Sequence, residues 1–262
     1  MIRLEKENLK KVLNYMEDDL LNCLYLYGDI VRYGLDNPNM TVWYSEKAGR
    51  INAVVMKYFT GSHIYSKNQD YNMEEILDKL EEINADRISS QREVIEALYP
   101  RLSEIYDVEY GCVFKLTKFR KMKSPVAIEK ADVSDARAIA ELLMSNETYS
   151  ESYNLDALAK ELEDRMKNGI GRSYIIRSGD RIVAHDSVTL ETDQYAIEGL
   201  ALVHDDFRNT LYGAFLDSYM INDLGKEGKE LYCMIVEGRR LESFVRLGNK
   251  IQTSYGKLFK KK

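Results

Sequence analysis

The chain has 262 residues, of which 45% are hydrophobic and 31% are charged, so it is long enough for two ordinary domains of about 100 to 150 residues each. Its net charge of -6 provides no general basic field for nucleic acid. Residues 1–11 lack the apolar region of a signal peptide, and no window approaches the roughly 20 apolar residues of a membrane span. We therefore expect a cytoplasmic monomer or homodimer that binds neither nucleic acid nor membrane.

The first half of the chain alternates between helical and strand patterns. Apolar spacing predicts helices at residues 9–16, 20–33, 73–80 and 91–98, and strands at residues 41–44, 51–59 and 110–117. A turn at Lys47-Ala48-Gly49 joins the first two strands as a hairpin. Cys23, Cys112 and Cys233 are far apart and odd in number, which predicts buried free thiols and no disulfide or metal site.

Residues 118–125, KFRKMKSP, combine basic side chains with a proline and follow neither periodicity. We interpret them as a linker and place a domain boundary near residue 122, which gives domains 1–122 and 123–262. Contact of this basic run with phosphate or an acidic partner is the alternative.

The second half gives a clear order of elements. A strand at 126–129 is followed by helices at 135–143 and 155–166, and then by three antiparallel strands at 174–177, 182–190 and 195–203. A long helix at 207–226, a strand at 231–236, a helix at 239–247 and a strand through Tyr255 and Phe259 complete the pattern. Helices that alternate with strands late in the chain predict an α/β fold with a mixed sheet.

The segment 199–220 carries the chemistry, because an apolar strand leads through a short acidic loop into a long helix. The first amides of such a helix have no intrahelical acceptor and can bind phosphate, with Arg208 adding charge and Gly213 permitting close approach. The alternative is that Asp205 or Asp206 caps the helix and Gly213 is a packing residue.

The element order and this loop resemble the GNAT acetyltransferase superfamily over residues 126–259. Arg208 to Gly213 is similar to the Q/R-x-x-G-x-G/A motif for acetyl-CoA, and Val203 lies where the family has a valine before the loop. The resemblance implies acetyl-CoA as co-substrate, with the pantetheine arm on Leu202 and Val203 where two parallel strands separate. It implies that the cofactor is bound by Leu202, Val203, Arg208, Asn209, Thr210, Leu211, Tyr212, Gly213 and Ala214.

Transfer to an amine needs a base, and Glu198 is our candidate, at a strand position where several GNAT enzymes carry a glutamate. A solvated strand carboxylate is the alternative reading of Glu198. His185 and Asp186 on the preceding strand are reserve bases.

Three single positions depart from the family pattern, and Gly248-Asn249 stands in place of its Gly-Phe pair. Leu211 replaces the first motif glycine and crowds the pyrophosphate unless it points into the core. Glu237 and Phe244 stand where the family often has Asn and Tyr, so Phe244 cannot protonate a leaving thiolate. Tyr255 is our candidate acid; Tyr232, Cys233 and solvent are alternatives.

The first half resembles the degenerate N-terminal domain of tandem GNAT proteins, especially over residues 26–38, and it contains no phosphate loop. The predicted fold is therefore two GNAT-like acyl-CoA N-acyltransferase domains in tandem. The predicted function is acetyl transfer from acetyl-CoA to an amine of a small molecule or peptide. The alternatives are a catalytically silent module that senses CoA or mediates protein contacts and, less consistent with the composition, a nucleic-acid-binding protein.

Overall fold

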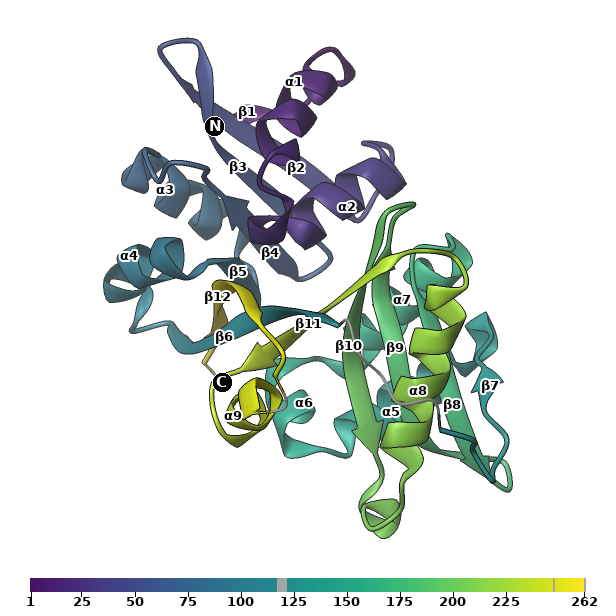
Figure 1. Cartoon of the computed structure of the whole chain (residues 1–262). Coiled ribbons are helices and arrows are strands. Elements are labelled where there is room, and N and C mark those ends of the chain that lie inside the picture. The colour runs from purple at the N-terminus through teal and green to yellow at the C-terminus, as the bar shows by residue number, and fades with distance from the viewer. Residues whose placement is uncertain (117–121, 247, 262) are drawn as a thin grey trace. The chain divides into compact units, whose positions relative to one another are not determined.

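The computed structural model describes residues 1–116, 122–246 and 248–261. The chain divides into two units, one formed by Met1–Val113 with Ile235–Lys262 and the other by Phe114–Met234. Each unit has a mixed sheet with helices on both faces, which confirms the predicted α/β class (Figure 1). Across the described ranges, no helix has the length and apolar character needed to cross a membrane.

The sheet of the first unit has the strand order β1-β2-β3-β4-β5-β12-β6. Its strands are β1 (Ile2–Arg3), β2 (Met40–Lys47), β3 (Arg50–Tyr58), β4 (Gly61–Tyr65), β5 (Arg87–Gln91), β12 (Ile251–Lys260) and β6 (Tyr106–Leu116). Its helices are α1 (Lys6–Glu17), the short 3₁₀ helix η1 (Leu20–Asn22), α2 (Leu24–Tyr33), α3 (Met73–Ile83), α4 (Arg92–Leu102) and α9 (Arg239–Arg246). The predicted helix at 20–33 is interrupted at Cys23, whose backbone is not helical.

Two apolar layers hold this sheet between helices. Val12 and Met16 of α1 pack with Leu26 and Ile30 of α2 against strands β2 and β3. On the other face, α3 and α4 pack against β3 and β5 through apolar side chains such as Ile76. The helical spacing read from the sequence corresponds to these buried faces.

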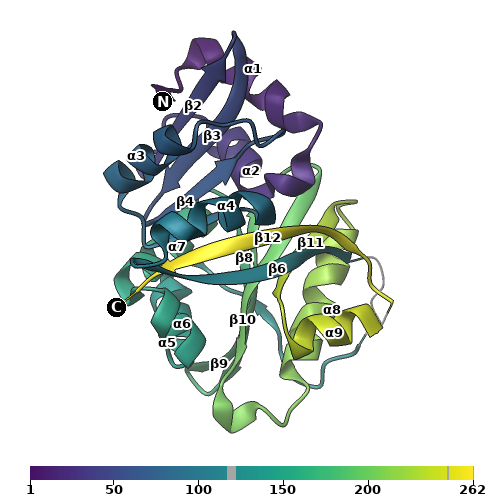
Figure 2. The same ribbon diagram turned by 90° about the vertical axis from the view of Figure 1, so that its left-hand side faces the viewer.

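Strand β12 comes from the C-terminal region and completes the first unit (Figure 2). It pairs antiparallel with β5, from Tyr255 opposite Gln91 to Phe259 opposite Arg87. Gly256 of β12 packs so closely on α4 that an added Cβ would lie 2.7 Å from the Cβ of Ile95. The final strand was predicted, whereas its pairing with an early strand was not.

The second unit has the strand order β11-β10-β9-β8-β7. Its strands are β7 (Glu129–Lys130), β8 (Arg172–Ser178), β9 (Arg181–Glu191), β10 (Tyr195–Val203) and β11 (Glu230–Val236). Its helical segments are η2 (Val133–Asp135), α5 (Ala136–Met144), α6 (Glu147–Ser152), α7 (Leu155–Lys167), η3 (Asp205–Phe207) and α8 (Tyr212–Gly225). Strands β8, β9 and β10 are antiparallel, as predicted, and β10 is parallel to β11.

Helices cover both faces of this second sheet. Ile139 of α5 and Leu158 of α7 pack against Ile175 of β8 on one face. Helix α8 covers the opposite face of β8 and β9, as Figure 1 shows, where the rings of Tyr174 and Tyr219 meet at 5.7 Å. The packing of α8 on β8 and β9 sets the position of the helix that follows the predicted cofactor loop.

Some predicted boundaries of the second half differ from the structure. The strand at 126–129 is reduced to β7 (Glu129–Lys130), and the helix at 207–226 begins at Tyr212. Residues 118–121 of the predicted linker lie outside the described residues, and the domain boundary near residue 122 stays a prediction. The three cysteines are buried free thiols, as predicted.

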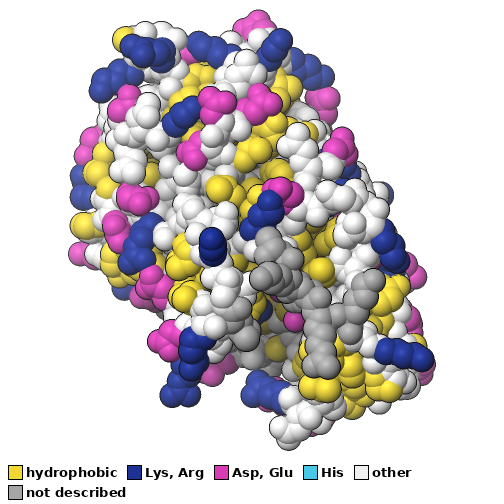
Figure 3. All heavy atoms as spheres, in the orientation of Figure 1, with side chains coloured by type: hydrophobic (Ala, Val, Ile, Leu, Met, Phe, Trp, Pro, Cys, Tyr) yellow, Lys and Arg dark blue, Asp and Glu magenta, His cyan; other side chains and the backbone are white. Residues whose placement is uncertain are grey.

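Charged side chains of both signs are interspersed over the face shown in Figure 3. Such mixing is typical of a solvated protein surface.

Candidate functional site

The loop between β10 and α8 is held by local hydrogen bonds rather than by helical ones. The His204 ring accepts from the amide of Asp206 at 3.2 Å, which caps η3. The Thr210 hydroxyl donates to the Phe207 carbonyl at 2.7 Å and accepts from the amide of Tyr212 at 3.3 Å. These contacts delay the start of α8 to Tyr212 and leave a separate turn before it.

The start of α8 offers backbone donors. The amide of Phe215 donates to the Leu211 carbonyl at 2.9 Å and is the first to make an α-helical bond. Within the described part of the chain, the amides of Gly213 and Ala214 have no protein acceptor. Because the helix dipole is positive at this end, these two N–H groups suit an anionic ligand such as phosphate.

Gly213 is not required by packing within the protein. An added Cβ would meet the Cγ2 of Val203 at 3.6 Å, which is an ordinary contact. Asp205 and Asp206 do not cap α8, because its N-cap is Leu211 and no side chain caps it. The structure therefore does not support the reading of this loop as a simple cap with a packing glycine.

Arg208 and Leu211 lie exposed on this loop. The Arg208 guanidinium pairs with the Asp205 carboxylate at 2.7 Å, and exposed pairs of this kind are weak enough to be exchanged for a ligand. Leu211 is 59% exposed, so it does not point into the core. The crowding expected of Leu211 is therefore not relieved by burial.

Strand β10 leaves its parallel partner at Glu198. Its register with β11 runs from Tyr195 opposite Glu230 to Glu198 opposite Cys233 and ends there. Beyond that point β10 continues to pair with β9, through a register shift between Gly199 and Leu202. Leu200 has a positive φ of 60°, unusual for a residue other than glycine, and it marks this bulge.

The end of the β10–β11 register places Leu202 and Val203 on a segment that pairs with β9 alone in the described register. Leu202 lies opposite His185, and Val203 lies opposite Ala184. The parallel strands thus pair only at one end, the arrangement expected where a pantetheine arm binds between separating strands.

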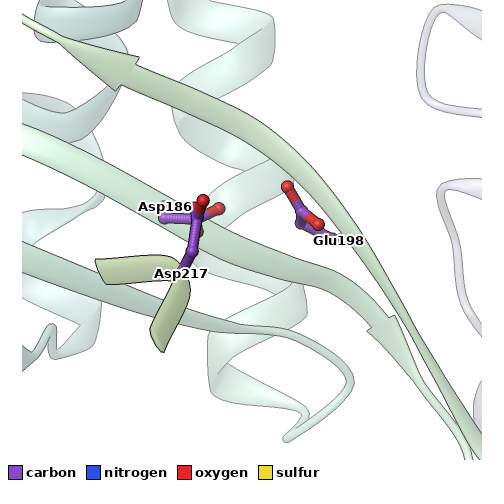
Figure 4. A group of neighbouring side chains, drawn as sticks. All are labelled: Asp186, Glu198 and Asp217. Carbon is purple, nitrogen blue, oxygen red and sulfur yellow. The ribbon is translucent and has the colours of Figure 1, made fainter. Parts of the chain in front are cut away.

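Three carboxylates converge beside this bulge (Figure 4). We call Asp186 of β9, Glu198 of β10 and Asp217 of α8 the carboxylate cluster; one oxygen of each lies within 4.8 Å of the others. Asp186 is 1% exposed, whereas Glu198 and Asp217 are half-buried. Ionised carboxylates this close repel one another, which favours the protonated form of the most buried member.

Asp186 is the buried member of the cluster. The amide of Ser187 donates to its Oδ1 at 2.8 Å, and a side-chain hydrogen bond links it to Asp217. Burial raises the pKa of Asp186 well above its ordinary value, and the charges of Glu198 and Asp217 raise it further. Asp186 therefore retains a proton to higher pH than an ordinary aspartate, which makes it a poorer candidate for the base than Glu198.

His185, the other reserve base, points to the opposite face of the sheet, since successive side chains of a strand alternate. Its Nε2 lies 3.0 Å from the Ser173 hydroxyl, and burial lowers the pKa of the imidazole to about 4. The structure therefore leaves Glu198 as the half-buried base candidate of this strand pair.

The candidate acids are distributed over both units. The Tyr232 hydroxyl on β11 donates to Glu230 at 2.6 Å, and burial raises its pKa. Cys233 lies opposite Glu198 in the parallel register. Tyr255 is buried on β12 of the first unit, and its role as acid stays a prediction. Glu237, also in the first unit, pairs with Arg92.

Asp217 was missed from the sequence. It is the one carboxylate in the otherwise apolar and small stretch from Gly213 to Met220, which is the only sign the sequence offers. Recognising Asp217 requires knowing which face of α8 packs against β9, because helical spacing alone does not say which strand residue lies opposite a helix residue.

The fold matches solved structures over nearly the whole chain. No protein-family model and no curated protein sequence matches the chain. A Drosophila protein aligns with a TM-score of 0.70 at 13% identity, over 99% of this chain and 97% of that one. A GCN5-related N-acetyltransferase-like protein from Streptococcus suis aligns with a TM-score of 0.62 at 10% identity, over 97% and 99%.

A tandem GNAT protein from the clavulanic acid biosynthesis pathway aligns with a TM-score of 0.59 at 12% identity, over 98% of this chain and 96% of that one. At these identities the likeness establishes the fold alone. The chain has the GNAT fold, in the two-domain form of a tandem GNAT protein.

Proposed function

We propose that this protein is an N-acetyltransferase that transfers an acetyl group from acetyl-CoA to an amine of a small molecule or peptide. The observation that carries the proposal is the end of the β10–β11 register at Glu198, directly before the loop into α8. That geometry combines a segment of β10 beyond the β10–β11 register, which we assign to the extended pantetheine arm, with backbone donors for phosphate. The names of the structural neighbours, GNAT and GCN5-related N-acetyltransferase proteins, agree with it.

The loop residues fit the phosphates of acetyl-CoA in two respects and oppose them in one. The amides of Gly213 and Ala214 are available donors, and Arg208 is held only by an exposed ion pair. Leu211 is exposed at the position of a motif glycine, and its side chain narrows the space in which the pyrophosphate would approach the backbone of the loop. We expect binding, with weaker affinity than a second glycine would give.

In the proposed reaction Glu198 accepts the proton of the acceptor amine. The deprotonated nitrogen forms a bond to the carbonyl carbon of the thioester, the carbon–sulfur bond breaks, and coenzyme A leaves as a thiolate. Tyr255 or solvent returns a proton to the sulfur. The Glu198 carboxylate suits the first step because its side chain is half-buried and lies where the β10–β11 register ends.

Thermal unfolding with acetyl-CoA tests the binding step. Ligand at about 100 times its dissociation constant should stabilise the protein by roughly 2.7 kcal/mol. Arg208→Ala should reduce this stabilisation, whereas Arg137→Ala, which removes a comparable exposed pair with Glu141, should not. Absence of any shift at millimolar acetyl-CoA would exclude the proposal.

A thiol-release assay with a panel of amines tests the transfer step. Glu198→Gln should lower kcat by about 10²- to 10⁴-fold, the usual contribution of a general base, with acetyl-CoA binding retained. Glu163→Gln, at an exposed position of α7, is the matched control. Unchanged turnover in Glu198→Gln would remove Glu198 as the base.

The exposed Leu211 also favours a second candidate, a catalytically silent module that senses CoA. The two functions predict the same thermal shift and differ in thiol release. Binding without release for any amine in the panel would favour the sensor.

A further inference from the structure

We propose that one face of the sheet in the first unit binds a small zwitterion with an ammonium and a carboxylate group, the chemical class of the free amino acids. The site consists of His63 of β4, Ser89 of β5, Lys257 of β12 and Glu109 of β6, which we call the polar row. The polar row lies in the first unit alone, so this proposal goes beyond the proposed acetyl transfer and does not depend on it.

The polar row crosses neighbouring strands, which follow one another as β4-β5-β12-β6 in the sheet (Figure 1). Ser89 lies opposite His63 in the parallel β4–β5 register and opposite Lys257 in the antiparallel β5–β12 register. Residues that lie opposite each other on paired strands direct their side chains to the same face. These three side chains therefore lie next to one another across the sheet.

Strand β6 brings Glu109 to the same place. The amide of Lys261 donates to the Ile105 carbonyl at 2.8 Å, and Gly111 lies against the ring of Tyr255. Contacts that advance along β6 while they go back along β12 mean that the two strands are antiparallel. Counted between these contacts, the members of the polar row on β6 and β12 lie level with each other.

The face that carries the polar row differs from the opposite face of the same strands. Ile88 and Leu258 alternate with the polar row along β5 and β12, and both are fully buried in the apolar layer with α3 and α4. On the face of the polar row, α1 and α2 pack on β2 to β4, and the Tyr25 ring of α2 stacks on His63 at 5.6 Å. The polar row thus begins beside α2 and extends away from it over β5, β12 and β6.

The two charged members of the polar row are half-buried and do not pair with each other. Among the described residues, the Lys257 ammonium has no hydrogen-bond acceptor and no ion pair, and it lies 5.0 Å from the centre of the Tyr255 ring. Glu109 has no hydrogen-bond donor in that part of the chain either. Burial lowers the pKa of Lys257 and raises that of Glu109, so their mutual attraction does not offset the cost of burying the two charges.

A zwitterion would satisfy both charged groups at once. Its ammonium would donate to the Glu109 carboxylate, and its carboxylate would accept from the Lys257 ammonium, in two charge-assisted hydrogen bonds. The Ser89 hydroxyl, held 2.7 Å from Nδ1 of His63, adds a polar group beside Lys257. Arg87, on the same face of β5, adds positive charge that acts on Lys257 and favours a carboxylate at this end.

Isothermal titration calorimetry of the full chain with each common L-amino acid tests the site. We expect at least one of them to bind. For alanine, ethylamine and propionate are matched fragments that each lack one charged group, and the corresponding fragments of any amino acid that binds should be weaker by about tenfold or more. No binding of any L-amino acid at millimolar concentration, or fragments as tight as the amino acid, would overturn the proposal.

Glu109→Gln and Lys257→Met each remove one charge while they keep most of the side-chain length. Each variant should bind the amino acid about tenfold or more weakly, because one charge-assisted hydrogen bond is lost. Lys6→Met is the matched control in the same unit, since it removes an exposed pair with Asp36, and it should bind as wild type does. Wild-type affinity in both Glu109→Gln and Lys257→Met would overturn the site.

NMR chemical shifts of wild type locate the bound amino acid even if a variant fails to fold. Amides of β5, β12 and β6 should shift with the amino acid alone, without acetyl-CoA. Shifts confined to β9, β10 and α8 would overturn the site and make the amino acid an acceptor in the proposed reaction instead. If β5, β12 and β6 respond while acetyl-CoA produces neither a thermal shift nor thiol release, the proposed function fails and the zwitterion site stands.

Discussion

Arg172 organises the acidic side chains at the end of α8 in the second unit. Its guanidinium contacts Glu227 at 2.8 Å and Asp223 at 3.2 Å, and it also pairs with Glu191. Lys229 binds Glu191 at 3.0 Å from the other side. The network joins β8 and β9 to α8, the helix that follows the proposed cofactor loop, so it supports the position of that helix.

Glu227 gives this network a pH dependence. The hydrogen bond from Arg172 lowers the pKa of Glu227 to about 2. A carboxyl group whose pKa is lowered by folding stabilises the folded protein at pH values above its pKa in the unfolded chain, about 4.3 for glutamate. This contribution is lost as pH falls toward 2. Wild type should therefore melt above Glu227→Gln at pH 7 by a small margin, since the side chain is 38% exposed, and the two should converge near pH 2.

Differential scanning calorimetry between pH 2 and 7 measures this difference. Glu163→Gln, which removes an exposed carboxylate of α7, should show little change with pH relative to wild type. A constant gap between Glu227→Gln and wild type over the whole range would show that the ion pair does not cause it.

Individual residues of the site were predictable only where they belong to a local pattern. The strand–loop–helix junction predicts residues 207–214 as the cofactor loop, and the resemblance to the family predicts Glu198 on the preceding strand as the base; both stay predictions. Asp217 could not be found this way, because its partner Asp186 lies on another element and the contact depends on how α8 packs. The sequence also did not say whether Leu211 turns into the core, and the structure shows that its side chain is exposed instead.

The β2–β3 hairpin shows how two turn residues determine the pairing of two neighbouring strands. Lys47 lies opposite Arg50, which leaves Ala48 and Gly49 as the two turn residues, with φ of 52° and 75°. Both positions are left-handed, as the tight turns of two-residue hairpins require, and Ala48 is the residue less suited to it.

Ala48→Asn should stabilise the protein by about 0.5 to 1 kcal/mol, because asparagine adopts the left-handed conformation more readily than alanine. Urea unfolding measures the change. Gly49→Ala is a control with the opposite expected sign and should destabilise the protein by about 1 kcal/mol, because alanine adopts the left-handed conformation less readily than glycine. Steric overlap does not contribute, since nothing lies within 4 Å of the added Cβ. A loss of stability in Ala48→Asn would mean that the turn is not limited by backbone strain.

Elements with strong periodicity were predicted well, and short polar ones were not. The helices α3 and α7 and the β8–β9 hairpin follow from apolar spacing and turn residues. Strand β5 was missed because its sequence, RISSQ, is mostly polar and short. Its serines are accommodated by hydrogen bonds such as that from Ser90 to the Ile64 carbonyl at 2.8 Å, which the sequence does not reveal.

On the scale of the whole molecule, the first unit depends on β12. Gly256→Ala should destabilise it by about 1 to 3 kcal/mol, because the added Cβ would overlap Ile95 of α4. Gly225→Ala on α8, where an added Cβ meets nothing within 4 Å, should instead leave stability unchanged or raise it.

Amide hydrogen exchange locates the effect of Gly256→Ala. Protection should fall in β5 and α4 of the first unit and be retained in β8 and β9 of the second. Equal loss in both units would show that they unfold together, and unchanged protection would show that Ile95 moves aside.

The placement of β12 also sets an order of assembly during synthesis on the ribosome. Residues 114–234 of the second unit are contiguous, so they can fold as soon as they emerge. Residues 1–113 emerge earlier, yet β5 lacks its antiparallel partner until β12 has been made. The half of the protein translated first is therefore completed last, and the open edge of β5 is the segment most exposed to wrong pairing meanwhile.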